Sequence, residues 1–206
     1  MRMQTYETSA RAAGRAADEA LALYAWNARI GGALLTPLHM CEVVIRNAVA
    51  DALEAVHGSR WPWNPGFERS LPRPLGPGYN AVADLQTTRA RAKSTGDVIA
   101  NLKFVFWEKT FTSRHDTKIW DPYLRQVLPN LDERASLSTH RKQIFDNLNQ
   151  VRLLRNRIAH HEPIFMRNLL DDFQTIQRLV EARCRTSSEW MLAQQQVLEL
   201  LAMKPF

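Results

Sequence analysis

Apolar residues recur along the chain at steps of three and four, the spacing that places them on one face of an α-helix. The clearest run covers residues 34–56 and predicts a helix there. Pro37 fits the first turn of that helix, where its missing N–H has no intrahelical bond to lose. Gly58 supplies the end, because glycine readily adopts the left-handed conformation that closes many helices.

The same spacing predicts further helices on both sides of this run. An earlier helix, rich in alanine, is expected over 6–29 and is joined to the 34–56 helix through Gly31 and Gly32. Later helices are expected over 79–93, 165–180 and 190–203. Alternation with a period of two residues is nowhere sustained, so the sequence predicts an all-α protein.

Half of the glycines and prolines of the chain fall in residues 58–78, which therefore predict a loop. Three aromatic residues in it, Trp61, Trp63 and Phe67, indicate that the loop packs onto the helices instead of linking two domains. The sequence therefore predicts a single domain over 1–206 with a long surface loop.

Two shorter features follow that loop. Residues 94–97, Ser-Thr-Gly-Asp, have the composition of a helix cap. Phe104, Phe106 and Trp107 are expected in the hydrophobic core, in preference to a platform on which bases stack.

The composition fits a soluble globular protein of 206 residues, of which 45% are hydrophobic and 23% are charged. No apolar run approaches the roughly 18 residues expected of a membrane-spanning helix, and the N-terminus lacks the apolar segment of a secretory signal. Cys41 and Cys184 lie inside apolar helical patterns, so a disulfide framework is not expected. We therefore expect a cytoplasmic protein without a membrane partner.

The formal net charge of +6 permits a polyanionic partner without requiring one. The excess of bases is local, because residues 141–167 contain six bases and only two acids. The six bases are Arg141, Lys142, Arg152, Arg155, Arg157 and Arg167. This stretch is the first candidate for a phosphate-binding surface.

Arg155 occupies an unusual place in the helical pattern. Position 155 falls in an apolar seam whose other members are Ile144, Leu148, Val151 and Ile158. A guanidinium cannot be deprotonated and is costly to bury without partners. The pattern therefore predicts a buried Arg155 that is compensated by a carboxylate, helix-end carbonyls, a subunit interface or a bound phosphate.

Asn156 and His160 are four residues apart and share one helix face. Arg155 lies about 140° round the helix from His160, but its long side chain can reach across an end turn. Pro163 disfavours helix at the residue before it, so His160 and His161 are expected where the helix ends. A histidine beside an arginine has the groups for RNA cleavage without a metal, since the imidazole moves a proton and the arginine stabilises charge on the phosphorane. The same spacing also arises by chance in helical proteins, with a structural arginine and an incidental histidine.

A metal site at His160, His161 and Glu162 is the weakest of the enzyme alternatives. Adjacent histidines point about 100° apart on a helix, and no further ligand stands at a standard spacing. The remaining histidines, at positions 39, 57, 115 and 140, are scattered and are expected at the surface or in packing.

Three stretches, in order along the chain, resemble one known family. Residues 154–164, Leu-Arg-Asn-Arg-Ile-Ala-His-His-Glu-Pro-Ile, resemble the signature of the Abi-like (abortive-infection) proteins, a branch of the HEPN superfamily. Residues 38–47 resemble an earlier helix of that family, followed by Trp61 after a glycine. Residues 102–107 and 119–122 resemble its middle aromatic segment, although the usual glycine is missing. The resemblance spans residues 20–180 and leaves a helical extension over 185–206 unmatched.

The resemblance implies a HEPN-like helical bundle in which Arg155 and His160 match the R-x4-6-H pair of HEPN ribonucleases. Asn156 matches the polar residue that follows the arginine. Such proteins generally dimerise to form one RNA-cleaving cleft, and they leave a 2′,3′-cyclic phosphate without a metal or other cofactor. Many act in phage defence or as toxins, which makes a cognate antitoxin a possible partner, while other members only bind nucleotides or RNA.

Other residues are placed around this pair as hypotheses. Arg152, Arg157 and His161 are candidate RNA contacts, with solvated charges at a helix end as the alternative. Glu42 and Arg46 are four residues apart on the 34–56 helix and are expected to form a salt bridge that orients Arg155, with a direct catalytic role as the alternative.

The sequence therefore favours a metal-independent endoribonuclease, with RNA as its substrate and a homodimer as its assembly. The alternative is a non-catalytic helical module that binds RNA or a protein partner.

Overall fold

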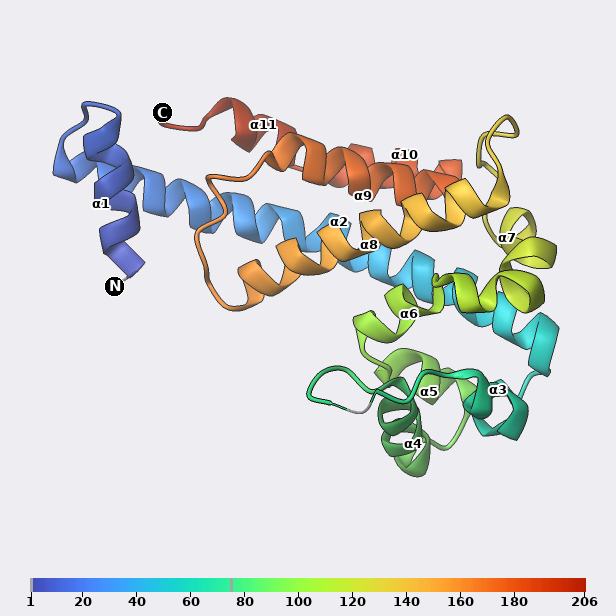
Figure 1. Ribbon diagram of the computed structural model, residues 1–206. Helices are drawn as coiled ribbons and strands as arrows, with labels where there is room; N and C mark the ends of the chain where they lie inside the picture. Colours follow the sequence, from blue (N-terminus) through green and yellow to red (C-terminus); the bar gives the residue numbers. More distant parts are fainter. Residues whose placement is uncertain (1, 75) are drawn as a thin grey trace. The chain divides into compact units, whose positions relative to one another are not determined.

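The computed structural model describes residues 2–74 and 76–206, and this part of the chain contains eleven α-helices and no strand (Figure 1). The all-α fold class predicted from the sequence is confirmed. Residue 75, in the predicted loop 58–78, lies outside the described residues.

The first seven α-helices are α1 (Arg2–Ala12), α2 (Ala17–His57), α3 (Pro65–Ser70), α4 (Ala81–Arg91), α5 (Thr95–Asn101), α6 (Phe104–Thr110) and α7 (Asp121–Val127). The last four are α8 (Leu137–Ala159), α9 (Leu169–Arg183), α10 (Arg185–Gln194) and α11 (Val197–Ala202). Three short turns of other helix types are η1 (Trp61–Trp63), η2 (Ser113–His115) and η3 (Asp116–Trp120).

The chain divides into two compact units. Unit 1 comprises Met1–Cys41, Gln150–Glu181 and Arg185–Phe206, and unit 2 comprises Glu42–Asn149 and Ala182–Cys184. The helices α2 and α8 each contribute residues to both units. The prediction of one domain over 1–206 stays a prediction.

In unit 1, the N-terminal helices divide differently from the prediction. The expected helix over 6–29 is interrupted at Gly14, which takes the left-handed conformation (φ 68°). The N–H of Arg15 then donates to the carbonyl of Ala10 at 2.8 Å and closes the end of α1. Conversely, α2 continues without a break through Gly31 and Gly32, where two helices were expected to meet. The prediction that separated these two helices is therefore wrong.

Tertiary packing explains why α2 does not end at its glycines. Ile30, Leu34 and Leu38 keep the helical spacing across them and are at most 4% exposed, so the buried stripe is unbroken. Pro37 lies inside this helix instead of in its first turn, at the cost of one backbone hydrogen bond. The predicted end is confirmed, since Gly58 adopts φ 82° and donates to the carbonyl of Glu54 at 2.8 Å.

The helix α2 is also long and apolar enough to cross a membrane. Its stretch Asp18–His57 contains a window of 18 residues with a mean hydropathy of 1.2, of which 39% is buried within the protein. The expectation that no stretch reaches this length is wrong. Because the core helix of a soluble protein passes the same test, the absence of a membrane partner stays a prediction.

In unit 2, the expected loop 58–78 contains two short helical elements, η1 and α3. Its aromatic residues pack as predicted: Trp61 and Phe67 are fully buried and meet edge to face at 5.3 Å between ring centroids. Phe106 and Trp107 of α6 are also buried, and Trp107 lies 6.3 Å from Trp61. The aromatic segment of α6 is therefore core, as expected.

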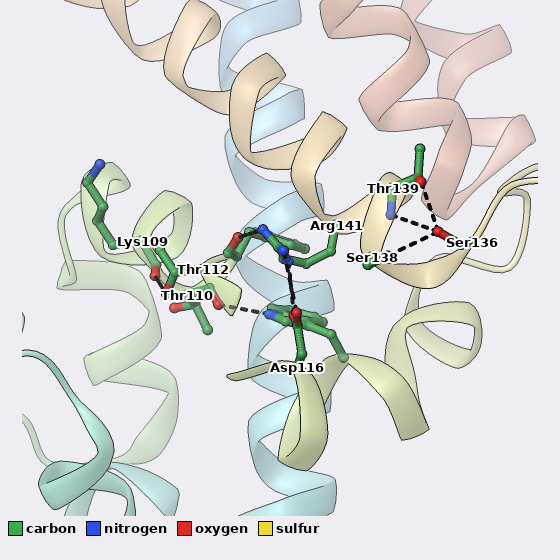
Figure 2. Close-up of polar contacts among 10 residues, drawn as sticks. Lys109, Thr110, Thr112, Asp116, Ser136, Ser138, Thr139 and Arg141 are labelled. Carbon is green, nitrogen blue, oxygen red and sulfur yellow. Dashed lines mark hydrogen bonds and ion pairs between the residues drawn. The ribbon is translucent and has the colours of Figure 1, made fainter. Parts of the chain in front are cut away.

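Serine caps fix the starts of two helices in unit 2. Ser94 and Asp97 form a reciprocal capping box at the start of α5, which confirms the cap predicted there. Ser136 accepts a hydrogen bond from the N–H of Thr139 at 3.2 Å and closes the first turn of α8 (Figure 2).

Figure 2 shows a second polar connection near the start of α8. Arg141 donates through Nε to Asp116 Oδ1 at 2.9 Å, which ties α8 to η3. Trp120, also from η3, donates to the carbonyl of Thr110 at 2.8 Å. Arg141 is thereby neutralised within unit 2.

The C-terminal residues belong to the core of unit 1. The expected helix over 165–180 begins later, at Leu169, and the expected helix over 190–203 is divided between α10 and α11. Trp26 of α2 donates to the carbonyl of Leu200 at 2.6 Å in a buried contact. The extension 185–206 therefore completes the packing of unit 1.

His115 is the clearest titratable group in the interior of unit 2. It is 3% exposed, and its Nε2 has no hydrogen-bond partner among the described residues. Burial, together with the positive charges of Arg114 and His57, lowers the pKa of His115 to about 4, and Asp116 offsets only part of this. The folded protein therefore holds His115 neutral at pH values where the unfolded chain protonates it.

This burial predicts a loss of stability in acid. The unfolded histidine has a pKa near 6.5, so stability is full above that pH and declines as the pH falls toward 4. Over this range, the free energy of unfolding should drop by about 3 kcal/mol. His115→Phe should remove this part of the pH dependence, because phenylalanine does not titrate. Urea unfolding at pH 7 and pH 4 measures both, with exposed His39→Gln as control. An equally steep pH dependence in His115→Phe would contradict the assignment.

Candidate functional site

The helix α8 ends at Ala159 in a turn that is closed by two backbone hydrogen bonds. The N–H of His161 donates to the carbonyl of Ile158 at 3.0 Å, and the N–H of Glu162 donates to that of Arg157 at 2.8 Å. This pattern is the Schellman motif, in which the residue after the cap is usually glycine. Here His161 occupies that left-handed position, with φ 55°.

The local sequence explains why the helix stops at this point. Pro163 disfavours helical geometry at Glu162, and the Glu162 carboxylate accepts from Arg157 Nε at 3.1 Å across the turn. The prediction that His160 and His161 lie at the end of the helix is confirmed. Both side chains are exposed.

Arg155 is exposed, so the prediction of a buried guanidinium at position 155 is wrong. The buried face of α8 continues from Val151, 3% exposed, to Leu154, which is fully buried. Position 155 lies about 100° round the helix from position 154, and a long arginine side chain at this margin extends into solvent. Arg155 therefore needs no internal partner to offset burial.

Arg155, Asn156 and His160 share one property. Within the described part of the chain, none of their side chains makes a hydrogen bond or ion pair. Asn156 is half-buried, and its backbone carbonyl accepts from the N–H of His160 at 2.9 Å, which couples these two positions across one turn. The three side chains are thus available to a ligand at one end of one helix.

Most of the other bases in residues 141–167 are engaged within the protein. Four of the six make ion pairs with carboxylates: Arg141 with Asp116, Lys142 with Asp146, Arg157 with Glu162 and Arg167 with Asp172. Arg152 also takes part in an intramolecular interaction. Among the described residues of this stretch, Arg155 alone keeps a guanidinium without a partner. The local excess of positive charge is therefore concentrated at Arg155.

Glu42 and Arg46 both lie in the part of α2 that belongs to unit 2, and both are half-buried. No hydrogen bond or ion pair joins them among residues 2–74 and 76–206, so the expected salt bridge does not form. The Nε of Arg46 is buried without a hydrogen-bond partner. Their role toward Arg155 stays a prediction.

A pocket in unit 1 lies next to the turn that ends α8. Its volume is about 450 Å³. The lining residues come from α1, α2, the end of α8 and the segment after it: Tyr6, Tyr24, Asn27, Ala28, Gly31, Gly32, Leu35, Ile158, His161, Glu162 and Ile164. We call it the Tyr24 pocket. The pocket was not predicted from the sequence, in which its one signal is the pair of glycines in an otherwise regular helix.

Neither glycine is required by the structure around it. A Cβ atom at Gly32 would meet nothing within 4 Å, and one at Gly31 would make only ordinary contacts of 3.9 Å with Ile158 and Ile164. Both have helical backbone conformations without positive φ. Because glycine costs a helix interior about 1 kcal/mol relative to alanine, the pair weakens α2 with no local gain.

Metal ligands do not gather anywhere in the described part of the chain: no three His, Cys, Asp or Glu side chains there are placed to hold one ion. His161 and Glu162 are adjacent at the turn, and Glu162 is already paired with Arg157.

Comparisons of the chain with protein-family models, with curated proteins and with solved structures find no match. The site is therefore interpreted from the geometry and chemistry of its own residues.

The left-handed position at the end of α8 gives a stability prediction. Replacing His161 by glycine should raise the free energy of unfolding by about 1 kcal/mol, because a side chain in this conformation is strained. Thermal unfolding measures the gain as a higher Tm. His160→Gly is the matched control at the preceding position, which lacks a positive φ, and it should not stabilise. A lower Tm for His161→Gly would show that the histidine side chain supports the turn.

Proposed function

We propose that this protein is a metal-independent endoribonuclease of the HEPN type. One observation carries the proposal: at the end of α8, the side chains of Arg155, Asn156 and His160 make no hydrogen bond or ion pair with any residue that the structure describes. Groups that a protein leaves unpaired at one place are available for a ligand, and a guanidinium prefers phosphate or carboxylate.

In the proposed reaction, the 2′-hydroxyl of the RNA attacks the adjacent phosphorus. The 2′-O–P bond forms, the bond to the 5′-oxygen of the next nucleotide breaks, and a proton passes from the 2′-hydroxyl to the leaving oxygen. His160 moves a proton at one of these oxygens, Arg155 stabilises the negative charge on the phosphorane, and Asn156 positions the phosphate or the histidine. The products carry a 2′,3′-cyclic phosphate and a 5′-hydroxyl.

The other site residues take supporting roles in this proposal. Arg152 and His161 contribute contacts to the RNA backbone. Arg157 keeps donors besides the Nε that binds Glu162, so it can contact a phosphate while holding the turn. The proposal needs no cofactor.

The family and its biology belong to the same proposal. The stretches at 38–47, at 102–107 with 119–122, and at 154–164 occur in order along the chain and support an Abi-like protein with a HEPN-like bundle. Such a protein would act in the cytoplasm in phage defence or as a toxin, with a cognate antitoxin as its natural partner.

A homodimer is supported by where apolar side chains are exposed. The nine large hydrophobic side chains that the described residues leave exposed all lie in unit 1, which also contains Arg155 and His160. They are Leu21, Tyr24, Leu35, Leu153, Met166, Leu170, Trp190, Leu198 and Met203. Exposed apolar side chains that adjoin one another mark protein–protein interfaces, so the proposal assigns this set to the surface that meets a second copy of the chain. A second copy would add its own His160, so that one imidazole serves each reacting oxygen.

The same exposure favours the alternative, a non-catalytic helical module that binds RNA or a protein partner. In that case Arg155 contributes to binding and His160 contributes nothing to function. The two alternatives differ in their response to the loss of His160.

Cleavage of a mixed structured RNA in EDTA tests the enzyme directly. His160→Ala should lower the rate at least 100-fold, the lower end of what a general acid or base contributes, and Arg155→Ala should lower it by about the same factor. Exposed residues of the same types, His39→Ala and Arg69→Ala, are matched controls that should cleave at the wild-type rate. Circular dichroism checks the folding of each variant. If the wild type binds RNA but does not cleave it, the binding module is the better description.

Salt dependence tests whether Arg155 contacts a phosphate. Losing one phosphate contact should reduce the slope of log K against log salt concentration by somewhat under one unit for single-stranded RNA. Arg155→Ala should show this change, while Arg157→Ala should show less because its guanidinium is shared with Glu162. Fluorescence anisotropy at several salt concentrations gives the slope. An unchanged slope for Arg155→Ala would place the phosphate elsewhere.

A further inference from the structure

We propose that the Tyr24 pocket binds a nucleobase. If the proposed function holds, on which this assignment rests, the base belongs to the RNA nucleotide next to the phosphate at Arg155 and His160. The link is short, because His161 lines the pocket and His160 precedes it, and consecutive Cα atoms are about 3.8 Å apart.

The size and lining of the pocket suit a small planar ligand. Its volume of about 450 Å³ lies within the range of small-molecule sites. Aromatic and aliphatic side chains form most of its wall, and the polar groups are few: Asn27, His161 and Glu162. Such a wall binds the face of a ring, while a few polar atoms recognise its edge.

Asn27 supplies a hydrogen-bond donor with a fixed direction. The side chain is 8% exposed, and its Oδ1 accepts from the N–H groups of Ile164 at 2.8 Å and Phe165 at 3.1 Å. These two bonds identify the oxygen, so the other atom is the amide nitrogen, which has no partner among the described residues. A donor that the fold holds in place without a partner in the described part of the chain is available to a ligand. Every base offers acceptors on its edges that would satisfy it.

Gly31 and Gly32 leave space in the pocket for a ligand. Side chains at Gly31 and Gly32 would be tolerated by the surrounding protein, yet both positions line the pocket without one. A planar ring can therefore lie directly against the backbone of α2. What the missing side chains provide is space for a ligand.

Tyr24 supplies a surface for stacking. It is 49% exposed, and its ring is held edge to face by buried Tyr6 at 5.3 Å. Tyr6 in turn packs against Phe165 at 5.0 Å. A base that stacks on an aromatic side chain loses affinity by a measurable factor when the ring is removed.

Filling the pocket is the sharpest test. Full-length protein carrying His160→Ala, which suppresses cleavage, is titrated into fluorescent homopolymeric RNAs of A, C, G or U, and separately into nucleoside monophosphates. Gly32→Leu should weaken binding of the preferred base about tenfold, comparable to the loss of one stacked base. Ala25→Leu is the matched control, because Ala25 is exposed on the same helix and does not line the pocket.

Two further changes test the edge and the face of the base. Asn27→Asp keeps an oxygen that accepts from Ile164 and Phe165 but removes the amide donor, so it should reduce the preference among the four bases. Tyr24→Phe should bind RNA as the wild type does, whereas Tyr24→Ala should bind several-fold more weakly. Circular dichroism confirms that each variant is folded.

The outcomes separate this proposal from the proposed function. The Gly32→Leu change is also made in protein that keeps His160. If this variant cleaves RNA, and its affinity for RNA and its preference among the bases are unchanged, the nucleobase proposal is overturned and the proposed ribonuclease stands. Binding of nucleoside monophosphates that Gly32→Leu blocks, without binding or cleavage of RNA, would support the nucleobase site and reject the ribonuclease. Light scattering measures the oligomeric state of each variant. If Gly32→Leu abolishes a dimer and leaves RNA binding unchanged, this face of α2 packs against a second copy of the chain, and the nucleobase proposal is overturned.

Discussion

The arrangement of the candidate site depends on one buried side chain, Asn27. The segment after α8 must leave the helix and turn toward α9, and its backbone N–H groups lose their helical partners on the way. Asn27 accepts two of them, from Ile164 and Phe165, in the interior of unit 1. This pair of bonds fixes the segment against α2 and thereby holds the turn at His160 and His161 in place.

Most of the charged side chains around this turn form ion pairs. Arg157 binds Glu162 across the turn, and Arg167 binds buried Asp172 further along with distances of 2.6 and 2.8 Å. The Asp172 partner raises the pKa of Arg167 above its ordinary value, so this arginine stays charged and structural. Arg155 is left as the base without a partner in the described part of this stretch. The pairing of its neighbours, more than its own spacing, is what singles out Arg155.

The features that were predicted correctly from the sequence are those set by residues close together in the chain. Helical spacing, the end of α2 at Gly58, the cap at Ser94 and the end of α8 before Pro163 are all local effects, and the structure confirms them. The wrong predictions concern tertiary packing. Whether Leu154 or Arg155 continues the buried face of α8 depends on what lies opposite, and the helical spacing is compatible with either. Tertiary packing likewise decides that α2 continues through Gly31 and Gly32, because the buried stripe on both sides of them is unbroken.

The Tyr24 pocket could not be predicted for a similar reason. Its key bonds join Asn27 to residues more than 130 positions away, as the separations of 137 and 138 show. An asparagine within a helix gives no sign of such partners, because its amide can equally point to solvent. Only the two glycines left a trace in the sequence, and there they were interpreted as a break between helices.

Several departures from local preference occur together in unit 1. His161 takes a conformation that favours glycine, Gly31 and Gly32 weaken a helix that could hold alanine, and the amide nitrogen of Asn27 makes no hydrogen bond within the described residues. The first two of these features lower the stability of the protein, and all four residues line one pocket. Unfavourable choices that were independent of one another would be scattered over the chain. Their convergence on one pocket is what a binding site requires, because a ligand that fills the space beside Gly31 and Gly32 and accepts from Asn27 stabilises the folded protein when it binds.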